Sequence, residues 1–370
     1  MDQCAVSSEW VARFRRSVRR WYVRGGRDLP WVGERDPYAV WVREIMLQQT
    51  TVKAVVPYLE RFLDQFPTVE ELAASETGEV LRVWEGLGYY SRARNLHRAA
   101  RVIVEEWGGQ WRETAVELQA LPGIGPYTAG AIASFAFDQP AAIVEANTAR
   151  LFSRLLALGV DPSSSEGRGQ LWSLAERVVP RVRAGEFNQA LIDLGATVCG
   201  VEARCRECPV RSSCRSLELG EVDRVPVRSP RRRTTDLFEL LLVIRRDDRL
   251  LLIQHPENER WGGLWGFPTL SRQGPLARSR IDELQIVSEA AEWGCDVEVD
   301  EWLQEFRHGV TRFRLHLQPV VATWRAGNWT GPVVAEWVEI DELPARPLSV
   351  AARRVADRVQ EGQRCGGVSR

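Results

Sequence analysis

The spacing of apolar residues changes once along the chain, and this change divides the sequence into two parts. From Glu9 to Cys199 apolar residues recur at three- and four-residue intervals, which is typical of packed helices. Helices are predicted at 38–49, 52–66, 91–107, 126–137, 148–158 and 187–198. From Leu237 two apolar β-type runs around residues 245–249 predict a hairpin. Further strands are expected at 312–324 and 334–340, and one helix near 281–293. The sequence therefore predicts an all-α domain followed by a smaller α+β domain.

With 370 residues the chain can form two hydrophobic cores. We expect a helical domain at 1–215, a linker at 216–236, a second domain at 237–350 and a C-terminal tail at 351–370. The linker is rich in proline and arginine. Its three arginines at 231–233 could contact phosphates or simply be solvated.

No apolar run approaches membrane-spanning length, and the N-terminus lacks the apolar stretch of a signal peptide. We therefore expect a cytoplasmic or nucleoid location and no membrane partner. A monomer is expected as well. The net charge of −1 gives no sign of nucleic-acid binding, so any DNA footprint must be a local patch.

Four cysteines lie within sixteen residues, in the pattern C-x5-C-x2-C-x5-C: Cys199, Cys205, Cys208 and Cys214. Four thiolates this close in sequence can wrap one soft metal centre. A [4Fe–4S] cluster is favoured because four-cysteine zinc sites usually contain two C-x2-C pairs and this loop has one; zinc remains the alternative. The same loop carries arginines suited to phosphate contact, or merely solvated, at Arg204, Arg206, Arg211 and Arg215.

The segment LPGIG (121–125) separates two predicted helices. Gly123 and Gly125 permit a tight turn next to a helix N-terminus, where backbone N–H groups can bind a DNA phosphate. A generic turn between two helices is the alternative.

Several segments together resemble a known family. LPGIGPYTAG followed by the four cysteines resembles the helix-hairpin-helix glycosylase superfamily that includes endonuclease III. VREIMLQQTTV (42–52), GLGYYSRARNLHRAA (86–100) and FNQALIDLGATVC (187–199) resemble its adenine DNA glycosylase (MutY) family. WGGLWGFP (261–268) extends the resemblance into the second domain, which is similar to a Nudix-like lesion-reading domain. The spacer between the first and second cysteines has five residues, one fewer than is usual in the family.

The resemblance implies base excision repair: hydrolysis of the N-glycosidic bond of adenine opposite 8-oxoguanine or guanine in double-stranded DNA. Such chemistry needs one protonated and one ionised carboxyl group. The family pattern assigns the acid to Glu44, which lies among apolar residues, and the charge-stabilising group to Glu145. The family has Asp-Gly where this chain has Glu145-Ala146. A displacement of about 1 Å can cost roughly 10²-fold in rate, so the pocket is rebuilt for Glu, the enzyme is slow, or the substrate has changed.

The resemblance also assigns the residues around these acids. Tyr127 and Asn147 match positions that bind the second carboxylate and orient water. Tyr127 also stands where related bifunctional enzymes carry a Schiff-base lysine; because Lys53 is the only lysine, no lysine-dependent strand cleavage is expected. Four residues match positions that fill the gap left by the extruded base or contact the base opposite it: Leu47, Gln48, Gln49 and Tyr89. The pocket for the extruded base is assigned to Arg27, Leu29, Trp31 and Asp193.

In the second domain, residues 286–294 lack the Glu-rich arrangement that holds Mg²⁺ in Nudix hydrolases, so no pyrophosphatase activity is expected. The family's reading loop has Phe-Ser-His where this chain has Val310-Thr311-Arg312. Thr311 and Arg312 keep a hydroxyl and a donor for the purine edge, and His308 is either a reading residue or a packed one.

Two other functions stay open on the sequence. One is a mismatch glycosylase on the same scaffold with another target base, such as thymine opposite guanine. The other is a DNA-lesion binding protein that has lost turnover because Glu replaces Asp at position 145.

Overall fold

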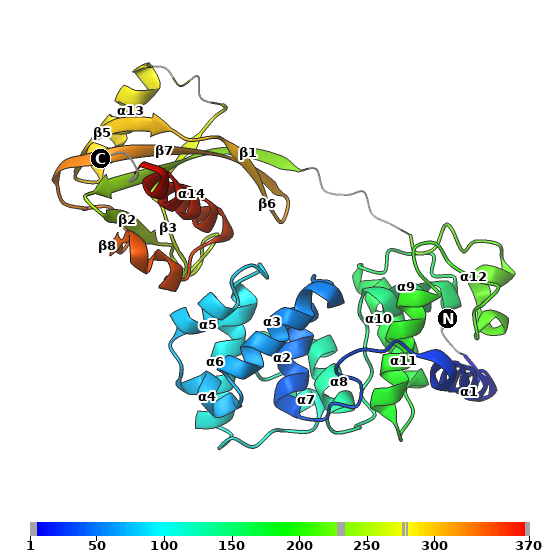
Figure 1. Ribbon diagram of the computed structural model, residues 1–370. Coiled ribbons are helices and arrows are strands. Elements are labelled where there is room, and N and C mark those ends of the chain that lie inside the picture. Colours follow the sequence, from blue (N-terminus) through cyan, green and yellow to red (C-terminus); the bar gives the residue numbers. More distant parts are fainter. Residues whose placement is uncertain (1–5, 228–233, 276–277, 279, 367–370) are drawn as a thin grey trace. The chain divides into compact units, whose positions relative to one another are not determined.

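A computed structural model describes residues 6–227, 234–275, 278 and 280–366. It forms two compact units, the first from Met1–Ala74 with Asn95–Pro230 and the second from Ser75–Arg94 with Arg231–Arg370 (Figure 1). The arginines at 231–233 lie outside the described residues, so their role stays a prediction.

The helices up to the linker follow one another with short connections. They are α1 (Ser8–Gly25), α2 (Pro37–Leu47), α3 (Val52–Gln65), α4 (Val69–Ala74), α5 (Thr77–Val83), α6 (Ser91–Glu105), α7 (Ala115–Leu118), α8 (Pro126–Phe135), α9 (Ala146–Leu156), α10 (Ser165–Val178), α11 (Ala184–Thr197), the 3-10 turn η1 (Arg211–Ser213) and α12 (Arg215–Glu218). Of these, α5 belongs to the second unit and α6 spans the division between the units.

Local sequence signals explain where these helices begin. The Asp36 carboxylate caps α2 by accepting from the backbone N–H groups of Tyr38 and Ala39, and Pro37 occupies the first turn, where its missing N–H costs nothing. Ser7, Thr51, Thr114 and Ser164 cap α1, α3, α7 and α10 in the same way. These caps set the starts of the helices, and burial of their apolar faces holds them together.

In the first unit α2 packs on α8, and α11 packs on α1, α8 and α9. One core of this unit joins α1, α9, α10 and α11 through Phe14, Phe152 and Phe187, all fully buried. Glycine allows the closest approach between α11 and α9, because a Cβ at Gly195 would lie 2.6 Å from the backbone oxygen of Asn147.

The second unit contains an eight-stranded sheet in which β3, β2, β1, β7 and β5 are neighbours in that order. The strands are β1 (Thr235–Arg246), β2 (Arg249–Gln254), β3 (Trp265–Gly266), β4 (Thr269–Arg272), β5 (Cys295–Trp302), β6 (Phe306–Val310), β7 (Phe313–Gly327) and β8 (Ala335–Glu339). β4 pairs with β1, β6 with β7 and β8 with β2; β1 and β7 are parallel, and the other pairs are antiparallel.

Helices cover both faces of this sheet, and we call the sheet with these helices the β-domain (Figure 1). Leu241 and Val243 of β1 share a core with α14 (Val350–Gly366), whereas Leu240 and Leu242 share another with α13 (Arg280–Glu292). The alternation follows from the two-residue period of a strand. The 3-10 turn η2 (Ile340–Ala345) precedes α14.

The predicted fold class, an all-α domain followed by a smaller α+β domain, is confirmed, and β1 and β2 form the predicted hairpin. The C-terminal tail expected at 351–370 is a correction: most of it is helix α14, whose small residues Ala351, Ala352 and Ala356 let the helix pack on the sheet. None of the helices in the described ranges combines the length and hydropathy needed to cross a bilayer.

Candidate active site

A cavity of about 750 Å³ opens in the first unit where the end of α2 meets the starts of α8 and α9. Most of the residues assigned to the site from the sequence line it, namely Arg27, Leu29, Trp31, Glu44, Leu47, Gln48, Gln49, Gly125, Tyr127, Glu145 and Asn147. Residues far apart in the chain thus converge on one space large enough for a nucleoside.

Glu44 lies in the last turns of α2 with its carboxyl group buried (3% exposed). Its Oε1 accepts a hydrogen bond from Arg43 Nε at 3.0 Å and forms an ion pair with Arg43 Nη2 at 2.9 Å. Its Oε2 accepts the hydroxyl hydrogen of Tyr127 at 2.6 Å, whereas the resemblance had implied that Tyr127 binds the second carboxylate, Glu145. Both oxygens are therefore held, one from α2 itself and one from α8.

Glu145 occupies the N-cap of α9, and its side chain folds back onto that helix. Oε1 accepts from Thr148 N at 2.8 Å, and Oε2 accepts from the backbone N and side-chain Nδ2 of Asn147 at 2.9 and 3.1 Å. Glu145 N in turn donates to Thr148 Oγ1 at 2.8 Å, which completes a capping box. The extra methylene of Glu, relative to Asp, is accommodated by this fold-back.

Burial dominates the electrostatics of the site. It raises the pKa of Tyr127 well above its ordinary value, and the neighbouring charge of Glu44 raises it further, so the phenol stays neutral and donates. Burial also raises the pKa of Glu145, against the opposing effect of the N–H groups of Asn147 and Thr148. A low-dielectric site of this kind strengthens the interaction of a carboxylate with positive charge on a bound substrate.

A buried aspartate supports the part of the cavity wall that Arg27 forms. Asp193 is fully buried in α11, accepts hydrogen bonds from Arg27 N and Nε at 2.8 Å, and forms an ion pair with Arg27 Nη2 at 2.8 Å. It also accepts from Gln189 Nε2 at 2.8 Å. Asp193, which the sequence assigned to the base pocket, lies behind Arg27 and Gln189, and those two side chains line the cavity in its place.

The sequence reasoning missed Arg43 and Gln189. Arg43 could have been noticed as a lone Arg-Glu pair inside the apolar run of α2, where buried charges need partners. Gln189 lies one helical turn before Asp193, a spacing that places both on one face of α11.

The wedge and opposite-base candidates occupy the loop after α2 and the start of α6. Gln48 Nε2 donates to Thr128 Oγ1 at 3.2 Å, and Gln49 is exposed with a left-handed φ of 58°. Tyr89 belongs to the second unit, is 44% exposed and has a φ of 49°. The guanidinium carbon of Arg92 lies 5.4 Å from the centre of the Tyr89 ring.

The predicted hairpin is formed by α7, the LPGIG turn and α8. Gly123 has a φ of 77°, and a Cβ there would lie 2.6 Å from Asn95 Cβ, so only glycine fits. Gly125 is exposed at the N-cap of α8, with open space around its Cα hydrogen and Pro126 at the first turn. The helix N-terminus is thus accessible to an anion.

Arg150 joins the site to the cysteine loop. Its Nη2 donates to Asn147 Oδ1 at 2.9 Å and to Gly195 O at 2.7 Å, and its Nε donates to Cys199 O at 2.8 Å. The loop therefore supports the residue that holds Glu145.

All four cysteines of the loop are free of disulfides and line one small cavity. Burial raises the pKa of Cys208 to about 12, and the other three thiols raise it further because they are near. No three ligating side chains in the described part of the chain stand close enough to hold a single metal ion. The shared cavity and the all-thiol donor set fit a cluster bound by four cysteines.

The four arginines of this loop are exposed, but Arg204 is bound within it. Arg204 pairs with Glu207 at 3.0 Å, and its Nε donates to Thr197 O at 3.2 Å. Of the predicted phosphate contacts, Arg206, Arg211 and Arg215 remain the more accessible candidates.

In the β-domain the reading-loop candidates lie on the β6–β7 hairpin. Thr311 is exposed at its tip with a φ of 52°, and the guanidinium of Arg312 lies 5.0 Å from the ring centre of Phe313. His308 lies 6.5 Å from Trp261 by ring centres, and burial lowers its pKa, so the imidazole is neutral at pH 7.

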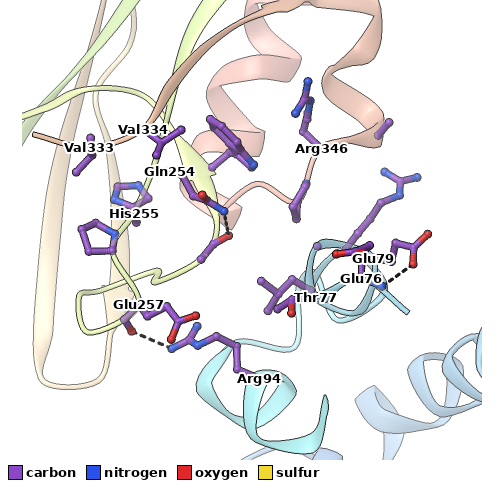
Figure 2. Close-up of a pocket in the computed structure, with 18 of the residues that line it drawn as sticks. Glu76, Thr77, Glu79, Arg94, Gln254, His255, Glu257, Val333, Val334 and Arg346 are labelled. Carbon is purple, nitrogen blue, oxygen red and sulfur yellow. Dashed lines mark hydrogen bonds between the residues drawn. The ribbon is translucent and has the colours of Figure 1, made fainter. Parts of the chain in front are cut away.

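A second cavity, of about 770 Å³, lies within the second unit (Figure 2). Glu76, Glu79 and Arg94 line it from α5 and α6, and Glu257 and Arg346 line it from the β-domain. Arg94 Nη2 donates to Glu257 O at 3.2 Å. None of the site residues predicted from the sequence lines this cavity, so the catalytic residues are assigned to the first.

Comparison with known proteins agrees with this geometry. Residues 42–177 match the HhH-GPD superfamily of base excision DNA repair proteins, and residues 240–358 match the NUDIX domain. A solved thermostable thymine-DNA glycosylase is 28% identical with a TM-score of 0.53, covering 57% of this chain and 98% of its own.

Relatives that span both domains are more specific. The adenine DNA glycosylase of Homo sapiens is 33% identical, with 96% of this chain and 75% of the relative covered. That of Mus musculus is 34% identical, with 96% and 79% covered. At this identity over almost the whole length, the chain belongs to the adenine DNA glycosylase family.

Proposed function

We propose that this chain removes adenine paired with 8-oxoguanine or guanine from double-stranded DNA by hydrolysis, and leaves an abasic site. The observation that carries the proposal is the convergence of Glu44, Glu145, Tyr127 and Asn147 on one cavity beside a helix-hairpin-helix turn. The names of the relatives supply the target base.

In this scheme Glu44 donates a proton to the purine ring, and the N-glycosidic bond breaks with its electron pair leaving on the adenine. The carboxylate of Glu145 stabilises the positive charge on the sugar. Water, oriented by Asn147, adds to the sugar carbon, and its proton restores the carboxyl of Glu44. The sole lysine, Lys53, is not among the cavity residues, so the reaction stops at the abasic site.

The test is single-turnover base release from duplexes containing A:8-oxoguanine, A:G or T:G. Adenine release, with strand breaks appearing only after alkali, supports the proposal. Thymine release would support a T:G enzyme, the second candidate suggested by the structural neighbour. Tight binding without release would indicate a lesion-binding protein.

We further propose that Cys199, Cys205, Cys208 and Cys214 hold one [4Fe–4S] cluster. The shared cavity and the family membership support it. Purified protein should show broad visible absorption that bleaches when the cluster is lost, whereas a zinc protein would be colourless.

The β6–β7 hairpin is proposed to read the base opposite adenine, because Thr311 and Arg312 are exposed at its tip. The Thr311→Ala, Arg312→Ala double variant should lose preference for A:8-oxoguanine over A:G while keeping A:G activity. An unchanged preference would contradict this role.

A further inference from the structure

Arg43 is an almost fully buried charged side chain, one residue before the proposed acid. It is 3% exposed, and its guanidinium carbon lies 5.6 Å from the Trp31 ring centre and 5.3 Å from that of Phe135. A guanidinium this buried is costly unless it is paired. Its partner is Glu44 Oε1, which accepts a hydrogen bond from Nε at 3.0 Å and forms an ion pair with Nη2 at 2.9 Å.

This pairing differs from the usual fork, in which two nitrogens bond two carboxylate oxygens. Here both nitrogens approach the same oxygen, Oε1, with Nε as a hydrogen-bond donor and Nη2 in the ion pair. Oε2 accepts one hydrogen bond, from the Tyr127 hydroxyl at 2.6 Å. Oε1 is therefore the oxygen paired with positive charge, so a proton on the carboxyl group favours Oε2.

We propose that Arg43 is a positioning residue that fixes the rotation of the Glu44 carboxyl group and places the transferable proton on Oε2. This rests on the proposed role of Glu44 as the acid. Glu44 is contacted by Arg43 from α2 and Tyr127 from α8, and the charge of Glu145 at the N-cap of α9 acts on the same site. Arg27 also lines the cavity, where it is paired with Asp193. Of the two groups bonded to the Glu44 carboxyl, Arg43 carries the positive charge, so its removal frees Oε1 to compete for the proton.

The experiment compares Arg43→Met, Arg43→Gln and Arg43→Lys with the unchanged protein in single-turnover adenine release and in duplex affinity. We expect Arg43→Met to slow base release about 10- to 100-fold, because a misplaced reacting group costs this much. Arg43→Gln should be nearly as slow, and Arg43→Lys should recover part of the rate because it restores a buried cationic donor. Duplex affinity should change by less than about threefold, since the guanidinium is buried away from DNA and contributes no phosphate contact.

Arg15→Met is the matched control. The guanidinium of Arg15 also makes structural bonds in the first unit, to Val178 O at 2.8 Å and Val179 O at 2.7 Å, but it does not line the cavity. That variant should lose thermal stability and keep its rate per active molecule, measured by the burst amplitude.

Three results would overturn the role of Arg43. They are an unchanged rate in Arg43→Met, no advantage of Arg43→Lys over Arg43→Gln, or a parallel loss of rate and affinity. If Arg43→Met does not fold, the comparison of Lys with Gln decides. If the unchanged protein releases no adenine from any duplex, the proposed function is wrong. If the unchanged protein and all Arg43 variants release adenine at the same rate, only the role of Arg43 is wrong.

Discussion

Glu44 and Glu145 share one cavity, but the partners that hold them differ in origin. Glu44 is held by side chains, Arg43 beside it and Tyr127 from α8. Glu145 is held mainly by the first turn of the helix that it caps, through backbone N–H groups of Asn147 and Thr148. Side-chain partners can be changed one at a time, whereas a cap is bound to the helix itself. The comparison indicates that substitutions around Glu44 change mainly the rate of base release, whereas those that remove the cap at Glu145 change both the rate and the stability of α9.

The largest effect is expected from Glu44→Gln, which keeps the shape of the side chain and removes the transferable proton. Single-turnover adenine release should fall about 10³-fold, within the range for loss of a general acid. Affinity for the A:8-oxoguanine duplex should stay close to that of the unchanged protein. A fall of less than about tenfold would remove Glu44 from the role of acid.

Glu145→Asp tests whether the pocket has been rebuilt for Glu. Asp is a good N-cap residue, so the melting temperature should change little. The carboxylate would retract from the positions set by Asn147 Nδ2 and Thr148 N, and the rate should fall about 10- to 100-fold. An equal or higher rate would show instead that Glu is a detuned substitute for Asp.

Tyr127→Phe removes the bond to Glu44 Oε2 and leaves the bonds from Arg43 in place. Because hydrogen bonds to charged groups contribute about 1.5–3 kcal/mol, we expect a rate loss of about tenfold or somewhat more. If the loss equals that of Glu44→Gln, Tyr127 does more than hold the carboxyl group.

The smallest effect concerns stability and pH. Since burial raises the pKa of Glu145 from its ordinary 4.5, the folded state holds this proton more tightly than the unfolded state. The resulting stabilisation is full below pH 4.5 and is lost as the pH rises through the folded pKa. The stability of the unchanged protein relative to Glu145→Gln should therefore decline over that window in urea titrations. A difference that rises with pH would contradict the raised pKa.

Much of the fold could be predicted because the signals are local. The change from helical to two-residue spacing placed the hairpin of β1 and β2, and Pro and Gly marked the turn before α8. The short strands β3 and β4 escaped prediction because two to four residues carry no usable period. Helix α14 was interpreted as a tail because its apolar face is mostly alanine, which gives a weak hydrophobic signal.

The candidate site was predicted by resemblance to a family, and its internal geometry was not. No pattern in the sequence says that Asp193 lies behind Arg27, or that the Tyr127 hydroxyl bonds Glu44. Those arrangements depend on packing between α2, α8 and α11, which are far apart in the chain. Resemblance to a family can assign a role to a residue, but only the contacts in the structure show how that residue is held.

The absence of a side chain at Gly195 limits how such an enzyme can diverge. A methyl group there would collide with the start of α9, so the Glu145 carboxyl group at the N-cap of that helix would shift with it. The contact is made by backbone atoms of Asn147, which a change of neighbouring side chains cannot move aside. Substitutions meant to reshape the cavity should therefore leave Gly195 as it is, because the position of Glu145 depends on it.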